Sequence, residues 1–206
     1  APHKGAYFAA SGLALLSVGA GLLQARATQW VIDGAGHPEL EVSLAYEPTE
    51  QLATVTVVQK QKVDARTPLF RIPTRVRFRI GDRDVDHPLE ITEPRHVFHL
   101  RLDEEPSQAI FDPGKVVLAA VKTDKPEPVW IGELAGATLG IDRGAAAQAL
   151  ARRASPAAEG ALGEALGRDP YWAVRGSAAI ALAAIRTPSA RDRLVEALAA
   201  EAHPRA

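Results

Sequence analysis

Histidine is the residue type in this sequence best suited to hold a metal ion, yet the spacing of the six histidines does not favour a metal site. None of them belongs to a His-Glu-x-x-His pattern, which would place two imidazoles on one side of a helix. His96 and His99 are the nearest pair, but residues three apart in a strand point to opposite faces. His87 falls on an inward strand position, where a hydrogen-bonded core histidine is expected. We therefore predict no metal ligand among His3, His37, His87, His96, His99 and His203.

Nucleophilic catalysis finds no better support in the residue pattern. The sequence has no cysteine and no Gly-x-Ser-x-Gly elbow, and Ser43 and Ser107 have no base near them in sequence. The glycine-rich stretches 33–36 and 132–140 lack the spacing with which known glycine loops hold phosphate. We therefore predict no catalytic residue and no cofactor-binding residue. A pair of carboxylates that meets only in the folded chain stays open as an alternative, as part of a small exported enzyme with an unrecognised site.

The balance of charge gives no reason to expect nucleic acid as a partner. The chain carries 24 basic and 25 acidic side chains, for a net charge of −1, so no global field attracts a polyanion. Six arginines do gather in residues 66–83. Nearby acidic residues offset them, and no aromatic residues interleave with them as a single-strand binding surface would require. A solvated strand face is the expectation.

Residues 7–23 form the one long hydrophobic run, and it carries no charge. The run is shorter than the ~20 residues of a membrane span, so no stable span is expected. A buried helix is one interpretation. An export signal is the other, because Ala-Arg-Ala at residues 25–27 follows the run in the position of a small-residue cleavage site. The localisation stays open between them. Since methionine is absent even at position 1, we also expect that the chain was cut from a longer one.

Between residues 38 and 122 the apolar residues recur with a period of two, which indicates β-strands. Turn residues separate about seven short runs with no helical pattern between them. This arrangement predicts an antiparallel, immunoglobulin-like β-sandwich. The expected strands are 38–47, 51–60, 71–80, 84–92, 96–102, 108–111 and 115–122.

A hairpin turn at residues 82 and 83 gives a register for two of these strands. It sets Phe78 opposite His87 on the inward face. On the outward face it sets Arg79 opposite Asp86 and Arg75 opposite Glu90, so that apolar residues meet apolar ones and positive charges meet negative ones.

From Asp142 onward the period becomes helical, and four helices are expected at 142–153, 156–167, 171–186 and 189–201. This region resembles HEAT repeats in Asp169, the Val174–Arg175 pair, the alanine-rich run 178–182 and a final Leu-x-x-Ala-Leu. About one and a half units fit, fewer than a free-standing solenoid needs. The predicted organisation is a short N-terminal apolar helix (1–30), the sandwich (31–122), a linker (123–141) and a HEAT-like helical domain (142–206).

The order of several short motifs is similar to the C-terminal region of aminopeptidase N-like zinc metallopeptidases, where the catalytic domain ends and an immunoglobulin-like sandwich begins. A Gln-Trp, then Gly-x-Pro before a strand, opens the match, and further motifs follow in the family's order over residues 29–120. Some bacterial members carry HEAT-like helices next. The matching residues are Gln29, Trp30, Gly36, Pro38, Gln59, Gln61, Phe70, Ile72, Pro73, Phe98, Leu100, Leu102, Pro106, Phe111, Asp112, Pro113 and Gly114.

The family's catalytic residues are not in this sequence. Its zinc helix and Gly-x-Met-Glu-Asn loop are missing, and its transition-state tyrosine would fall at Pro2. The resemblance therefore implies a non-catalytic accessory portion of a zinc metalloaminopeptidase, with zinc in the parent family but no cofactor in this chain. The partner would be the parent catalytic domain or another protein. The alternative is a free-standing HEAT and β-sandwich interaction module.

Overall fold

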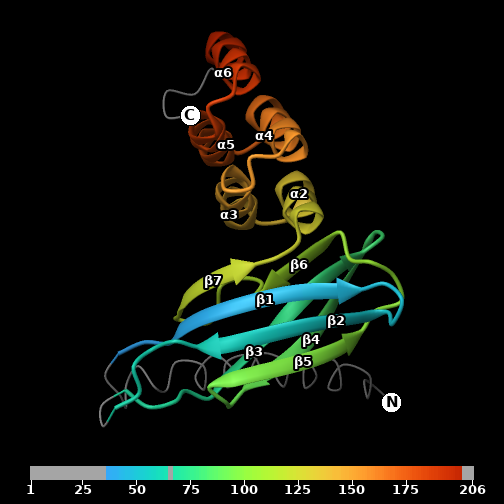
Figure 1. The fold of residues 1–206 in the computed structure, drawn as a ribbon, viewed down its shortest axis with the longest axis vertical. Coiled ribbons are helices and arrows are strands. Elements are labelled where there is room, and N and C mark those ends of the chain that lie inside the picture. Colours follow the sequence, from blue (N-terminus) through green and yellow to red (C-terminus); the bar gives the residue numbers. More distant parts are fainter. Residues whose placement is uncertain (1–35, 65–66, 201–206) are drawn as a thin grey trace, which may run out of the picture.

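The computed structural model describes residues 36–64 and 67–200, and it shows a β region followed by a stack of helices (Figure 1). The predicted N-terminal helix at 1–30 lies outside the described residues. The strands are β1 (Glu39–Glu47), β2 (Leu52–Gln59), β3 (Ile72–Ile80), β4 (Arg83–Ile91), β5 (Arg95–Arg101), β6 (Gln108–Phe111) and β7 (Ala120–Asp124). The helices are α2 (Glu127–Gly136), α3 (Gly140–Ala151), α4 (Pro156–Arg168), α5 (Trp172–Ile185) and α6 (Pro188–Ala200).

The strands form two sheets that share one core. The first has the order β5-β2-β1-β7 and the second β4-β3-β6. Alternate residues of both sheets turn inward, and the core joins Val42 and Val55 of the first sheet to Ile72 and Phe78 of the second. The expectation of antiparallel pairing is wrong at one place: β7 runs parallel to β1, because the chain crosses from β6 in the second sheet to the far edge of the first.

The hairpin between β3 and β4 turns one residue earlier than predicted, at Gly81 and Asp82, which moves the strand pairing by two residues. Ile80 pairs with Arg83, and Gly81 stands at the first turn position with a φ of +53°, a conformation that glycine adopts without strain. Phe78 therefore lies opposite Val85 rather than His87. A shift of two residues leaves every side chain on its predicted face, since the strand period is two.

The arginine-rich face of β3 is neutralised by β4, as expected, but through different partners. Arg77 binds Asp86 with both oxygens engaged, at 2.6 and 2.9 Å, and Arg79 pairs with Asp84. Glu90 accepts a bond from Arg71 at 2.6 Å instead of Arg75. These pairs engage Arg71, Arg77 and Arg79 of the arginine-rich face.

The helices lie in two rows above the β region (Figure 1). One row holds α2, α4 and α6, and the other holds α3 and α5. Helix α2 lies within the predicted linker 123–141, where no helix was expected, and packs against β6. Gly132 permits this contact: a side chain there would meet the carbonyl oxygen of Ser107 at 2.0 Å. The helical stack thus begins directly on the sheet.

The amino-acid sequence of the helical stack repeats with a period of 32 residues. Helix α3 carries Arg-Gly-Ala-Ala-Ala-Gln-Ala-Leu from Arg143, and α5 carries Arg-Gly-Ser-Ala-Ala-Ile-Ala-Leu from Arg175. Helices α4 and α6 share a Ser/Thr before a proline, then an alanine, a leucine and Glu-Ala-Leu at matching positions. The rows of Figure 1 therefore reflect a repeated pair of helices, α3 with α4 and α5 with α6, and each helix lies in the same row as its copy.

Candidate functional site

The histidines do not converge on a common point. His96 and His99 lie on opposite faces of β5: the ring of His96 stacks on Phe98 at 4.2 Å, while His99 is exposed and meets the hydroxyl of Thr54 at 3.3 Å. His87 is half-buried with an edge contact to Phe78. Its Nε2 atom is buried without a hydrogen-bond partner, so the expected satisfied core histidine was wrong in that respect. His37 is exposed, and His3 and His203 lie outside the described residues.

Other catalytic groupings are also not seen in the described part of the chain. Ser107 donates to the carbonyl of Arg79 at 3.3 Å, a bond that ties down a turn rather than activating a nucleophile. Across residues 36–64 and 67–200, no group of three histidine or acidic side chains could hold a metal ion. In the same residues no helix has the length and apolar character needed to cross a bilayer.

Several residues that carry the resemblance to aminopeptidase N-like metallopeptidases form structural hydrogen bonds in the β region. The side chain of Gln59 donates to the carbonyl of Phe70 at 2.8 Å and accepts from its amide at 3.0 Å. Gln61 donates to Gln59 at 2.8 Å and accepts from the amide of Glu39. Asp112 is buried and accepts from two backbone amides of the following loop. These buried bonds fix loops between the strands, so the motifs specify the fold.

The junction between the β region and the helices contains a buried ion pair. Lys125 follows β7 and donates to both carboxylate oxygens of Glu133 on α2, at 2.6 and 2.7 Å. The ammonium group also lies 4.1 Å from the ring centre of Trp130. Glu133 in turn accepts from the amide of Ala109 on β6 at 3.1 Å. Through these contacts α2 is attached to both sheets.

Burial shifts both members of this pair toward their neutral forms. Loss of water lowers the pKa of Lys125 and raises the pKa of Glu133, although their mutual attraction opposes both changes. The short bonds favour the charged pair. The hydrogen bonds between the two groups offset the loss of water around them. Removal of one partner would leave the charge of the other buried without compensation.

The outer end of the stack differs from this junction. In α4 the repeated leucines are buried, with Leu162 at 0% and Leu166 at 8% exposure. At the matching positions of α6, Leu194 is half-buried and Leu198 is 81% exposed. Val195, one turn before Leu198, is also exposed at 64%. In α4, these leucines share a buried cluster with Val174 and Leu182 of α5, and α6 has no such partner helix among the described residues.

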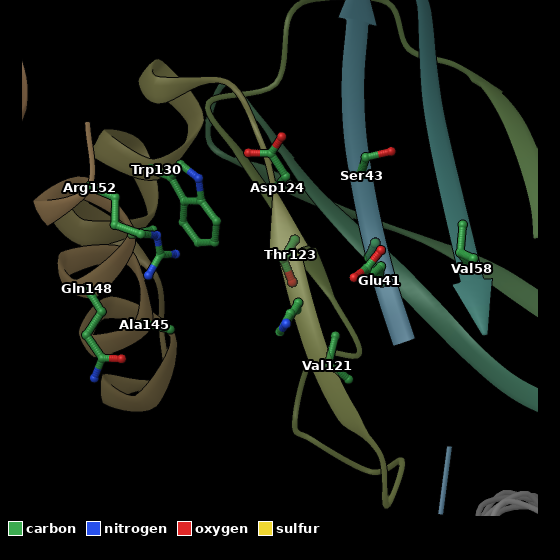
Figure 2. A pocket seen from close by; sticks show the side chains of 13 residues that line it. Glu41, Ser43, Val58, Val121, Thr123, Asp124, Trp130, Ala145, Gln148 and Arg152 are labelled. Atoms are coloured by element: carbon green, nitrogen blue, oxygen red, sulfur yellow. The ribbon is translucent and has the colours of Figure 1, made fainter. Parts of the chain in front are cut away.

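A groove of about 750 Å³ runs between the free edge of β7 and helix α3 (Figure 2). Val121 and Thr123 of β7 form one wall, and Gln148 and Arg152 of α3 form the other. Trp130 closes one side. Glu41, Ser43 and Val58 of β1 and β2 also line it, so the groove extends from the helix surface past the edge strand and over the outer face of the first sheet.

The acids in this groove have partners, and two of its cations do not. Glu41 pairs with Lys60 at 3.5 Å, and Asp124 pairs with Arg153 at 2.7 Å. Lys122 and Arg152 are exposed and form no ion pair with any residue in 36–64 or 67–200. The unpaired charge of the groove is therefore positive.

Comparison with known proteins assigns the helical part to a repeat class. Residues 128–206 match HEAT repeats. In such solenoids each unit contacts its neighbours and the stack offers an extended binding surface. No curated protein sequence matches the chain. Among solved structures, the crystal structure of Legionella pneumophila aminopeptidase A in complex with aspartic acid is similar, at 14% identity and a TM-score of 0.48. The alignment covers 80% of this chain and 21% of that one.

The sequence alone did not identify the residues of the buried ion pair, of the exposed face of α6 or of the groove. Lys125 and Glu133 lie within the predicted linker, and the sequence pattern marks Leu198 only as part of a HEAT-like helix end. A search for internal repeats would have found the 32-residue match and aligned Leu166 with Leu198. No comparable signal marks the groove, because β7 and α3 meet only in the folded chain.

Proposed function

We propose that this chain is a non-catalytic interaction module that holds a helix of a neighbouring protein against α6. The observation that carries the proposal is the contrast between Leu166 and Leu198, which stand at matching positions of the repeat. Leu166 is covered by the helix that follows it, and Leu198 is not covered by any described residue. Exposed leucine and valine on one side of a helix are typical of an interaction surface.

The repeat also supports a particular chemistry for the partner. The helix that covers α4 presents Val174, Ala178, Ala181 and Leu182, all of which are buried. Small residues let two helices approach closely, and the larger ones fill the space between the leucines of α4. The partner of α6 would then be an alanine-rich helix with a branched residue at each end of its contact.

A finer proposal is that the neighbour is the catalytic domain of an aminopeptidase N-like zinc metallopeptidase. The motif order in the sequence supports it, and so does the way Gln59, Gln61 and Phe70 join in one buried cluster of the β region. Seven described strands in a four-plus-three arrangement also favour an immunoglobulin-like sandwich. In this proposal the chain supplies packing surface, and the zinc and its ligands belong to the neighbour.

A synthetic peptide that copies residues 169–187 tests the interaction surface. Because α6 repeats the residues of α4, a second copy of the α5 sequence should bind beside α6 and shift the amide resonances of Leu194, Val195 and Leu198. The exposed variant Leu198→Glu should abolish these shifts. Leu118→Glu is the matched control, since Leu118 is 58% exposed on the β region. Shifts that leave α6 unaffected, or survive in Leu198→Glu, would contradict the proposal.

Enzyme assays separate the accessory role from catalysis. The purified chain with added zinc should not hydrolyse aminoacyl p-nitroanilides. Mixed with an aminopeptidase N-like catalytic domain that lacks its own C-terminal region, it should form a complex by size-exclusion chromatography, and Leu198→Glu should weaken that complex. Zinc-dependent turnover by the chain alone would reject a non-catalytic role. Absence of the complex would reject the finer proposal while leaving the helix-binding surface to the peptide experiment.

A further inference from the structure

We propose that the groove between β7 and α3 binds an extended acidic segment of a partner protein, which joins the first sheet as a strand beside β7. This surface is separate from the face of α6 that carries the proposed function. Three features of the groove support this ligand: the free edge of β7, the unpaired cations, and the helix wall opposite the edge.

The backbone of β7 is open on the groove side. β7 pairs only with β1 among the described strands, at the end of its sheet. The amide of Ala120 donates toward β1, to the carbonyl of Pro38 at 2.9 Å. Backbone groups alternate in direction along a strand, so those of Val121 and Thr123 point to the free edge. An edge of this kind is a template for one more strand.

Charge selects the kind of segment that fits. The carboxylates of Glu41 and Asp124 already have basic partners at 3.5 and 2.7 Å. Lys122 on the strand and Arg152 on the helix both line the groove and remain without an ion-pair partner among the described residues. Glutamate or aspartate at alternate positions of an added strand would reach them, while apolar residues between would lie over Val121, which is 39% exposed.

The helix wall limits what can enter. Gln148 and Arg152 face β7 from α3 across a space of about 750 Å³, so the ligand must lie between a strand edge and a helix (Figure 2). A single extended chain has the flat shape that such a space requires. Strand addition would leave its outer edge facing Gln148, whose amide can donate and accept.

The probe is an acetylated and amidated Glu-Val-Glu-Val-Glu-Val-Glu peptide with a fluorescent label, measured by anisotropy with the full chain. We expect it to bind about tenfold more tightly than the same peptide with lysine in place of glutamate. Two isomers carry two N-methyl groups each, either on the last two valines or on the two inner glutamates. Only one of these sets of amides faces β7 in a paired strand, so one isomer should lose binding and the other should keep it.

Variants of the chain locate the binding surface. Lys122→Glu combined with Arg152→Glu should weaken the acidic peptide about tenfold, and both positions are exposed, so the fold is retained. Lys62→Glu combined with Arg168→Glu changes the same charge away from the groove and should leave affinity unchanged. Leu198→Glu should also leave it unchanged, which separates this site from the proposed helix surface. No detectable binding, equal binding of the lysine peptide, retention by both methylated isomers, or an unaffected groove variant would each overturn the proposal.

Discussion

At one end of the helical stack, α2 meets the β region through a buried ion pair, whereas at the other end α6 exposes leucine and valine. The inner end uses Lys125, Glu133 and the close approach at Gly132, each of which fits one fixed geometry. The outer end presents Val195 and Leu198, which are exposed and apolar. A partner would bind them through shape and buried area alone. From this contrast we infer that the inner junction is a permanent contact within the chain. The outer end would instead be a surface for a partner that binds reversibly.

The middle of the stack shows what the outer end would become if it were covered. Helices α4 and α6 have the same residues at six matching positions, so their intrinsic preferences are alike. Burial of their leucines differs because α4 packs against α2, α3 and α5, whereas α6 packs, among the described helices, only against α4 and α5. Coverage by a neighbour, rather than local sequence, therefore decides how much each leucine contributes to stability.

The largest effect is expected at the inner end. Replacement of Lys125 by methionine would leave the carboxylate of Glu133 buried without its cation, and the free energy of unfolding should fall by about 3–5 kcal/mol. Thermal or urea unfolding of the full chain measures it. We attribute this loss of stability to the uncompensated charge and not to lost side-chain volume, because methionine is similar in size to lysine.

The double variant Lys125→Met with Glu133→Gln tests that reason. It removes both charges and keeps an oxygen that can accept from the amide of Ala109. Its stability should return close to that of the unmodified chain. If the double variant is as unstable as Lys125→Met alone, the inner junction depends on packing and the contrast between the two ends is lost.

The second effect compares matching leucines. Leu166→Ala empties a buried site in α4 and should cost about 3 kcal/mol, whereas Leu198→Ala removes a side chain that water already surrounds and should cost less than about 0.5 kcal/mol. Both variants are measured by urea unfolding at the same pH. A cost at Leu198 as large as that at Leu166 would mean that α6 is covered in solution, and the open surface would then have to be abandoned.

The sequence was informative about periodicity and less so about contacts between distant residues. The inward and outward positions of the strands and the four helices after Asp142 followed from local patterns, because each pattern is set by the geometry of one element. α2 was missed since its ten residues include Pro128 and two glycines, which hide a helical pattern. The pairing of Lys125 with Glu133 depends on burial that only the packed sheets and helices create. The unpaired cations of the groove depend likewise on which acids find other partners.

The smallest effect concerns the residues that start α4 and α6. Ser155 accepts from the amide of Ala158 at 3.0 Å and donates to Glu127 on α2 at 2.6 Å. Thr187 repeats both contacts, accepting from Ala190 at 3.0 Å and donating to Glu159 on α4 at 2.7 Å. Loss of such a cap costs about 1 kcal/mol. Ser155→Ala should therefore lower the global midpoint of unfolding, while Thr187→Ala should raise only the amide exchange of α6, because nothing described packs beyond that helix.

Acid should act on the outer end in the same direction as Thr187→Ala. Hydrogen bonds from Ser189 and Thr187 hold the pKa of Glu159 below its ordinary value, which for glutamate is about 4.3. A lowered folded pKa contributes stability that is present above the ordinary value and is lost as pH falls through the folded one. The protection of α6 amides from exchange, taken relative to the rate of an unfolded chain at the same pH, should therefore fall below about pH 4 before that of α4 and α5. In Glu159→Gln this early response should disappear, and exchange that rises equally along all the helices would show that the two ends of the stack open together.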